Sequence, residues 1–230
     1  MLNKKITVKR INLDSMLEKL IELEEKLKHH SHDQTAIKIV QEFATSLGKT
    51  RNKQVLFGTD GVLLREPPII YQEVVEKGLI SQDEDPFSLL QGDIISTDAA
   101  YFFGERLLGM KFIIASSTCD LVENRRDNAV LFRIQPINND DKSAASTISE
   151  LLRFKSTKLM YLPRLKSDTT DVIANLVLLD GVVQIHLNDL HLATRHASLG
   201  LTGWRIFGAL LKTVMARTGE SEVKIRTSIF

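Results

Sequence analysis

Short runs of apolar residues, separated by polar breaks, dominate the middle of the chain. The first three lie at residues 93–96, 110–115 and 129–134. Runs of this length, rich in β-branched and aromatic residues and bounded by turn residues, predict the strands of a small, curled antiparallel sheet. Residues 159–162 have the same character and stop at Pro163, which predicts a fourth strand.

Two further apolar runs, 173–179 and 182–187, flank the dipeptide Asp180-Gly181. An Asp-Gly pair between two such runs predicts a two-residue β-hairpin turn, because both central positions of that turn require positive φ. The runs 54–57 and 62–64 lie on either side of a glycine-bounded turn segment and predict a shorter hairpin.

A helical period governs both ends of the chain. From residue 12 or 14 to 27, and again over 33–47, apolar residues recur at steps of three and four with charged residues between them. This pattern predicts two amphipathic helices joined as a helical hairpin. Residues 201–217 repeat the pattern and predict a final helix with Trp204 facing the core. Two shorter helices are expected at 69–77 and 144–155.

Together these elements predict an α+β fold, in which an N-terminal helical hairpin precedes a small antiparallel SH3-like β-barrel closed by a C-terminal helix. The acidic segment 81–86 (SQDEDP) is the best linker candidate. We therefore expect a helical region with a short β-hairpin over 1–80 and the barrel domain over 88–230. Helices in proteins draw most of their stability from tertiary contacts, so we do not expect an isolated pair to be stable. The helices of residues 12–47 must then pack on their own domain, on a protein partner or on a second copy.

The composition narrows the chemistry. The 230 residues carry a formal net charge of +1, so no overall field draws the protein to nucleic acid or to a membrane. Cys119 is the only cysteine, which excludes an internal disulfide and favours a reducing cytoplasm. No apolar run approaches the roughly 20 residues that span a bilayer, so no membrane contact is expected. The segment 29–33 (HHSHD) predicts a solvated helix end, with no metal and no cofactor, because adjacent side chains point apart.

Three pieces of sequence carry a resemblance to a known family. Gly92-Asp93-Ile94-Ile95 opens the predicted barrel, 109–116 (GMKFIIAS) is a strand that follows a glycine, and 131–136 (LFRIQP) is a strand that ends in proline. The order of these pieces, with a final helix after 198–200 (SLG), resembles the MazF/PemK-type toxins over residues 91–217. The resemblance implies an SH3-like barrel and a metal-independent endoribonuclease activity.

The chain departs from that family at the catalytic positions. Toxins of this type use an arginine just before the second strand to stabilise the transition state, and the matching position here is Met110, beside Lys111. They also use a serine or threonine after the proline-ended strand, where this chain has 137–139 (INN). Loss of a positioned cation at a developing charge costs several kcal/mol of barrier. Arg106 and Lys111 are the candidates to replace it.

The segment 116–120 (SSTCD), at the end of the middle strand, holds the other candidate catalytic residues. Cys119 would act as a nucleophile if a histidine base lay within hydrogen-bond reach. The candidate bases are His186, His191 and His196. The alternative is that Cys119 is a small buried apolar residue and that Asp120 caps the following turn.

A basic face on the barrel is the candidate binding surface. Its predicted members are Lys111, Arg125, Arg126 and Arg133, with Tyr101 as an aromatic contact. SH3-like barrels bind nucleic acid or peptides through such faces. The alternative is that Arg125 and Arg126 are solvated hairpin charges beside acidic neighbours.

Two functional hypotheses follow from these patterns. The first is a non-catalytic interaction module that binds a protein or nucleic-acid partner, in a toxin–antitoxin or phage-defence setting. The second is a metal-independent endoribonuclease of the MazF/PemK type with a rearranged active site. The missing arginine favours the first.

Overall fold

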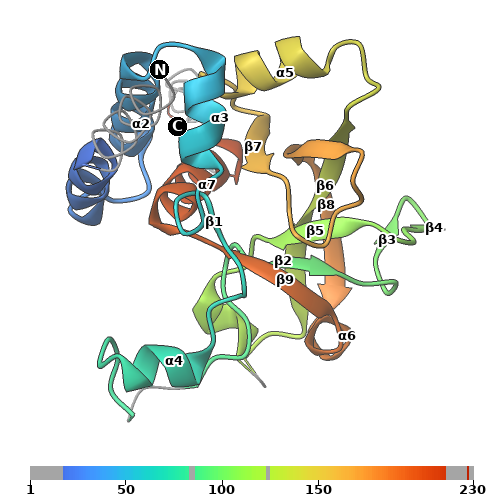
Figure 1. Cartoon of the computed structure of the whole chain (residues 1–230). Helices are drawn as coiled ribbons and strands as arrows, with labels where there is room; N and C mark the ends of the chain where they lie inside the picture. The colour runs from blue at the N-terminus through green and yellow to red at the C-terminus, as the bar shows by residue number, and fades with distance from the viewer. Residues whose placement is uncertain (1–17, 83–85, 123–124, 216–226, 228–230) are drawn as a thin grey trace.

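Seven strands form one antiparallel sheet in the order β1-β9-β2-β5-β6-β8-β7 (Figure 1). The computed structural model describes residues 18–82, 86–122, 125–215 and 227. The sheet curls into a nearly closed, barrel-like form, with helices at both of its ends. Its strands are β1 (Leu64–Arg65), β2 (Ile94–Ser96), β5 (Lys111–Ile114), β6 (Asn128–Asn138), β7 (Leu159–Pro163), β8 (Val172–His186) and β9 (Thr194–Leu199).

The predicted mixed fold with an antiparallel, barrel-like sheet is confirmed, and its SH3-like identity stays a prediction. β2, β5, β6 and β7 fall on the four apolar runs that predicted strands. Both faces of the sheet are covered, because Phe112 and Ile114 of β5 belong to one buried cluster while Ile113 belongs to another. Strands buried on both faces have near-continuous apolar sequences, which explains why these strands could be predicted from their apolar runs.

The β-hairpin predicted across Asp180-Gly181 is wrong, because β8 is one continuous strand through this dipeptide. The register of β8 against β6 shifts between Phe132 and Arg133, so the dipeptide lies in a bulge. A Cβ at Gly181 would lie only 2.7 Å from Nε of Arg133. The glycine therefore makes room for a guanidinium group instead of forming a turn.

The short hairpin predicted over 54–57 and 62–64 is also wrong. Residues 54–57 belong to a helix, α3 (Thr50–Phe57), which buries Leu56 and Phe57. β1 follows, and it pairs antiparallel with β9 at the other end of the chain. The local sequence around β1 does not indicate a strand partner that is so distant along the chain. The glycine-bounded turn segment nearby therefore led to the incorrect prediction of a local hairpin.

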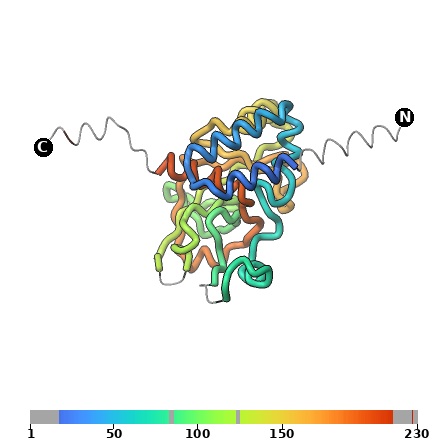
Figure 2. Tube along the Cα trace, turned by 90° about the vertical axis from the view of Figure 1, so that its left-hand side faces the viewer, coloured from blue at the N-terminus to red at the C-terminus, as the bar shows by residue number. Residues whose placement is uncertain are grey.

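Helices occupy both ends of the barrel-like sheet, as a second view shows (Figure 2). Residues 18–28 are helical, and with α2, α3 and α5 they lie at one end, whereas α4 lies at the other. The pairing of the first two helices as a hairpin stays a prediction, and the proposed start at residue 12 or 14 lies outside the described residues. The remaining helices are α2 (Gln34–Ser46), α4 (Tyr71–Glu76), α5 (Ala144–Leu151), α6 (Leu187–His191) and α7 (Leu201–Met215).

The segment between the first two helices is fixed against α7. Asp33 caps α2, since its Oδ1 accepts hydrogen bonds from the N–H groups of Thr35 (2.9 Å) and Ala36 (3.1 Å). The imidazole of His32 meets the ring of Trp204 edge-on, with centroids 4.0 Å apart. Both ring nitrogens of His32 are buried and have no hydrogen-bond partner among the described residues.

Two buried apolar clusters share the sheet. The first joins residues from α2, α3, α5 and α7 to residues of β5, β6 and β8, and it includes Leu27, Val40, Phe57, Phe132 and Phe207. Residues of both predicted domains, 1–80 and 88–230, therefore contribute to it. The second cluster lies on the opposite face of β5 and includes Phe112, Leu131 and Ile185. In the described part of the chain, no helix has the length and apolarity needed to cross a bilayer.

Candidate functional site

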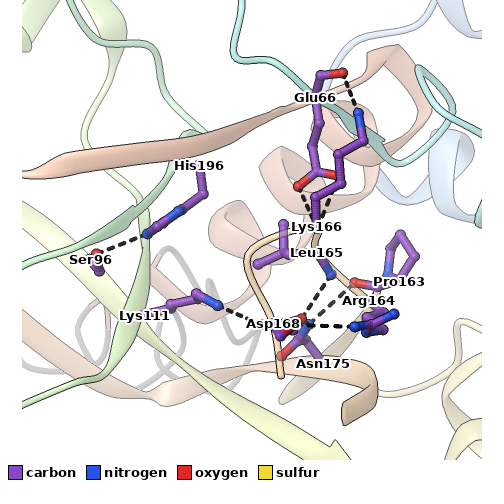
Figure 3. Close-up of polar contacts among 10 residues, drawn as sticks. All are labelled: Glu66, Ser96, Lys111, Pro163, Arg164, Leu165, Lys166, Asp168, Asn175 and His196. Carbon is purple, nitrogen blue, oxygen red and sulfur yellow. Dashed lines mark hydrogen bonds and ion pairs between the residues drawn. The ribbon is translucent and has the colours of Figure 1, made fainter. Parts of the chain in front are cut away.

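A cavity of about 750 Å³ lies against the barrel-like sheet. β2, β5, β6, β8 and β9 and the segment 167–169 between β7 and β8 contribute to its walls. Five polar side chains of the cavity wall lie close together (Figure 3). They are Ser96, Lys111, Asp168, Asn175 and His196.

Lys111 and Asp168 form an ion pair in the cavity wall, with Nζ 2.5 Å from Oδ1. The second carboxylate oxygen of Asp168 accepts hydrogen bonds from Nδ2 of Asn175 (2.7 Å) and from the N–H of Leu165 (2.8 Å). Burial by itself would raise the pKa of Asp168, but the hydrogen bonds from Lys111 and Asn175 outweigh it and lower that pKa. At neutral pH, Asp168 is therefore ionised and holds the ammonium group in place.

His196 lies on a β-bulge beside the cavity. The register between β2 and β9 shifts between Ile94 and Ile95, and His196 is the extra residue that this shift leaves on β9. Bulges re-aim the side chain of such a residue and are frequent next to active sites. The imidazole of His196 lines the cavity, and its Nε2 lies 2.8 Å from Oγ of Ser96, the last residue of β2.

Burial lowers the pKa of His196 below its ordinary value, and the positive charge of Lys111 lowers it further. The carboxylate of Asp168 acts in the opposite direction but does not reverse the shift. The imidazole is consequently neutral at pH 7, with one nitrogen free to accept a proton.

A buried charge network holds β9 against the start of β2, next to this bulge. The fully buried carboxylate of Asp93 accepts hydrogen bonds from Ser198 Oγ (2.6 Å) and the N–H of Leu90 (2.8 Å), and its Oδ2 lies 2.7 Å from Nη2 of Arg195. Burial raises the pKa of Asp93, while Arg195 and Ser198 act to lower it. The network fixes the strand that carries His196.

A small hairpin stands apart from the main sheet. It consists of β3 (Tyr101–Phe102) and β4 (Glu105–Arg106), and we call residues 101–108 the wing. The ring of Phe102 lies on the guanidinium group of Arg133, 4.4 Å from Cζ to the ring centroid, which attaches the wing to the sheet. Tyr101, Phe103 and Leu108 remain 56%, 93% and 61% exposed. The wing thus presents an apolar surface to solvent.

Phe103, at the turn of the wing, has a left-handed backbone with φ of +52°. A non-glycine residue in this conformation carries a cost of about 1–2 kcal/mol. Phe154 has a similar φ of +53°, but its ring is buried and meets Phe57 edge-on at 4.9 Å. The ring of Phe103 meets only Phe102 among the described rings, at 4.4 Å, and is almost fully exposed. The packing of the chain does not explain why an aromatic residue occupies this turn.

The predicted basic residues do not gather on one face. Lys111 pairs with Asp168 in the cavity, and its strand partner is Ile134. Arg133 pairs with Phe112 in the next register position, which places it on the opposite face of the sheet, under Phe102. Arg125 and Arg126 are exposed in the segment before β6, where Arg126 Nε lies 3.4 Å from Asp120 Oδ1.

The other candidates lie on the wing or near the 3-10 turn Thr118–Leu121. Tyr101 and Arg106 face each other across the wing, where Arg106 Nε donates to the carbonyl of Asp98 at 2.6 Å. Cys119 is exposed, and its Sγ lies 3.0 Å from Ser117 Oγ. In the described segments, no hydrogen bond joins Cys119 to a histidine, and its three candidate bases bond to other groups.

No family model, no curated protein and no solved structure matches this chain. The site is therefore interpreted from its own residues. Sequence reasoning missed Ser96, Asp168 and Asn175, and it considered His196 only as a base for Cys119. Within the described ranges, no three His, Cys, Asp or Glu side chains are placed to hold a metal ion.

Proposed function

We propose that this chain is an interaction module that binds a protein partner through the wing. The observation that carries the proposal is Phe103, which combines a left-handed backbone with a side chain that is 93% exposed. Strain of this kind persists at ligand and partner sites, where the side chain serves the contact and not the fold. Binding through the wing involves no catalytic reaction.

The wing has the composition of an interface hot spot. Tyr101 and Phe103 supply exposed aromatic area at a low cost in side-chain entropy, and Arg106 lies opposite Tyr101 in the hairpin. The partner we expect carries an apolar cleft for the Phe103 ring and an acidic group for Arg106.

A protein partner is favoured over nucleic acid because the cations near the wing are already engaged. Lys111 is ion-paired with Asp168, and Arg133 lies under Phe102. Nucleic-acid binding needs several cations free to meet phosphates. Phosphate contact would therefore have to come from Arg106 and from residues on other faces.

The substitution Phe103→Asn tests this proposal, because Asn-Gly is the preferred pair at such a turn. We expect the free energy of unfolding to rise by about 1 kcal/mol, since asparagine tolerates the left-handed backbone. We expect partner binding to be lost in the same variant. A contact that served only the fold would give the opposite pattern, with lower stability and unchanged binding.

The partner can be sought with a photo-crosslinking amino acid at position 103 of the full chain in cells. A matched control is position 79, where the leucine is 70% exposed and lies outside the wing. A discrete crosslinked protein at 103 but not at 79 supports the proposal. Identical patterns at the two positions, or a shift of single-stranded RNA by the purified chain that survives Phe103→Asn, would contradict it.

A second candidate is the metal-independent endoribonuclease implied by the resemblance to MazF/PemK-type toxins. One observation favours it: Met110 and Lys111, at the family's arginine position, line the same cavity as Pro136 and His196. Mixed RNA incubated with the full chain and a chelator tests this reading. Cleavage that is lost in Lys111→Ala supports it, with Arg106→Ala and Cys119→Ala run in parallel, whereas intact RNA rejects it. The toxin–antitoxin or phage-defence setting stays a prediction.

A further inference from the structure

We propose that Ser96 and His196 form a nucleophile–base pair that hydrolyses carboxylic esters in the 750 Å³ cavity, an activity beyond partner binding at the wing. Nucleophilic catalysis by a hydroxyl group requires a base within hydrogen-bond reach, and Nε2 of His196 lies 2.8 Å from Oγ of Ser96. Both side chains line the cavity, so a substrate carbonyl can reach the hydroxyl.

The bulge on β9 orients the His196 imidazole toward Ser96. Without the extra residue, the alternation of side chains along β9 would send position 196 to the other face of the sheet. The register shift next to Ile94 instead turns the imidazole toward the cavity, where Ser96 ends β2. The buried network of Asp93 and Arg195 holds the two strands at this point.

The electrostatics of the cavity suit a general base. His196 is neutral at pH 7, because burial and the charge of Lys111 lower its pKa despite the opposing charge of Asp168. With its proton on Nδ1, the ring presents Nε2 as an acceptor to the serine hydroxyl. A neutral base near the operating pH is the form that general-base catalysis needs.

Lys111 supplies the positive charge that the reaction would use. One N–H of its ammonium group is directed to Asp168, which leaves two for other partners. In Figure 3 the ammonium group lies between the Ser96–His196 pair and Asp168. A cation fixed in this place stabilises the oxyanion that forms when a carbonyl carbon is attacked.

The reaction proceeds in two balanced steps. The Ser96 hydroxyl gives its proton to His196 Nε2 while Oγ bonds to the ester carbonyl carbon, and the carbonyl oxygen becomes an oxyanion near Lys111. The bond from this carbon to the alcohol oxygen then breaks, and the leaving oxygen takes the proton from Nε2. Water attacks the acyl-serine by the same proton route and releases the carboxylic acid. One ester and one water give one acid and one alcohol.

A second serine–histidine contact in the chain provides a matched control. Ser88 Oγ lies 3.2 Å from Nδ1 of His191, but Ser88 is exposed and neither residue lines the cavity. The proposal therefore predicts that Ser96 reacts as a nucleophile and that Ser88 does not.

The direct test is to treat the full chain with a fluorophosphonate, which loses fluoride to an activated serine, and to map the modified peptide by mass spectrometry. Modification of Ser96 ahead of all other serines is the expected result. Modification that is spread over exposed serines, or absent, overturns the proposal. The mapping uses the unaltered chain, so it does not depend on whether a variant folds.

The second test measures hydrolysis of p-nitrophenyl acetate. We expect Ser96→Ala and His196→Gln each to lose about 10²-fold in rate, the usual size of general-base catalysis, and Ser88→Ala to keep the full rate. The rate should rise with pH through the lowered pKa of His196 and be level above pH 6.5, its ordinary value. Equal rates in the three variants would refute the pair. Because the assay contains no partner protein, it is independent of binding at the wing.

Discussion

His32 lies against Gly208 in α7. We therefore predict that Gly208→Ala lowers the free energy of unfolding when His32 is present and raises it when His32 is replaced by alanine. Gly208 lies inside α7, where alanine normally stabilises a helix by about 1 kcal/mol relative to glycine. A Cβ at this position, however, would lie 2.1 Å from Nδ1 of His32. Atoms cannot approach so closely, so the imidazole would have to leave the edge of Trp204.

The magnitudes decide which effect dominates in Gly208→Ala. Overpacking of a filled site costs about 1–3 kcal/mol, against the helix gain of about 1 kcal/mol. We therefore expect Gly208→Ala to lower the free energy of unfolding by up to about 2 kcal/mol. In a His32→Ala background the obstacle is gone, and the same substitution should raise it by about 1 kcal/mol.

A double-mutant cycle measures this coupling. Urea unfolding of the four proteins can be followed by the fluorescence of Trp204, the single tryptophan, which lies beside the altered contact. We expect an interaction energy of about 1–3 kcal/mol between the two sites. If Gly208→Ala stabilises both backgrounds equally, the imidazole does not occupy the space above the glycine and the reasoning fails.

Two further predictions concern charge and assembly. Asp168→Asn should lower the free energy of unfolding at pH 7 by about 1–3 kcal/mol, because it leaves Lys111 without its partner. The lowered pKa of Asp168 means that this stabilisation exists above the ordinary value of 3.8 and is lost as pH falls through the folded-state pKa. The two proteins should therefore converge in acid, and a difference that persists at pH 2 would contradict the role of the ion pair. The side chain of Ile21 is 62% exposed. If residues 12–47 mediate a dimer, Ile21→Lys should convert the dimer to a monomer, as measured by sedimentation. An unchanged mass would exclude Ile21 from the interface.

The sequence was most informative where local pattern and tertiary role agree. The runs at 110–115 and 129–134 became β5 and β6 because strands covered on both faces are apolar throughout. The period of 201–217 predicted α7, although its last two residues lie outside the described part. In these elements the same residues set both the local structure and the core.

Prediction failed where distant residues decide the structure. β9 has the sequence TRHASL, which lacks a strand pattern, and it forms a strand because β1 and β2 pair with it. The dipeptide Asp180-Gly181 has the sequence of a turn, but Arg133 needs the space above the glycine. The cavity was missed for the same reason, since Ser96 and His196 meet only through the pairing of β2 with β9.

The position of β9 between β1 and β2 also has a consequence for synthesis. Among the described strands, β1 pairs only with β9, and β2 keeps one open edge until residues 194–199 have left the ribosome. An open strand edge is a template for pairing with another chain. A nascent or truncated chain that ends before residue 194 should therefore be prone to aggregation, and release of the last part of the sequence closes the sheet.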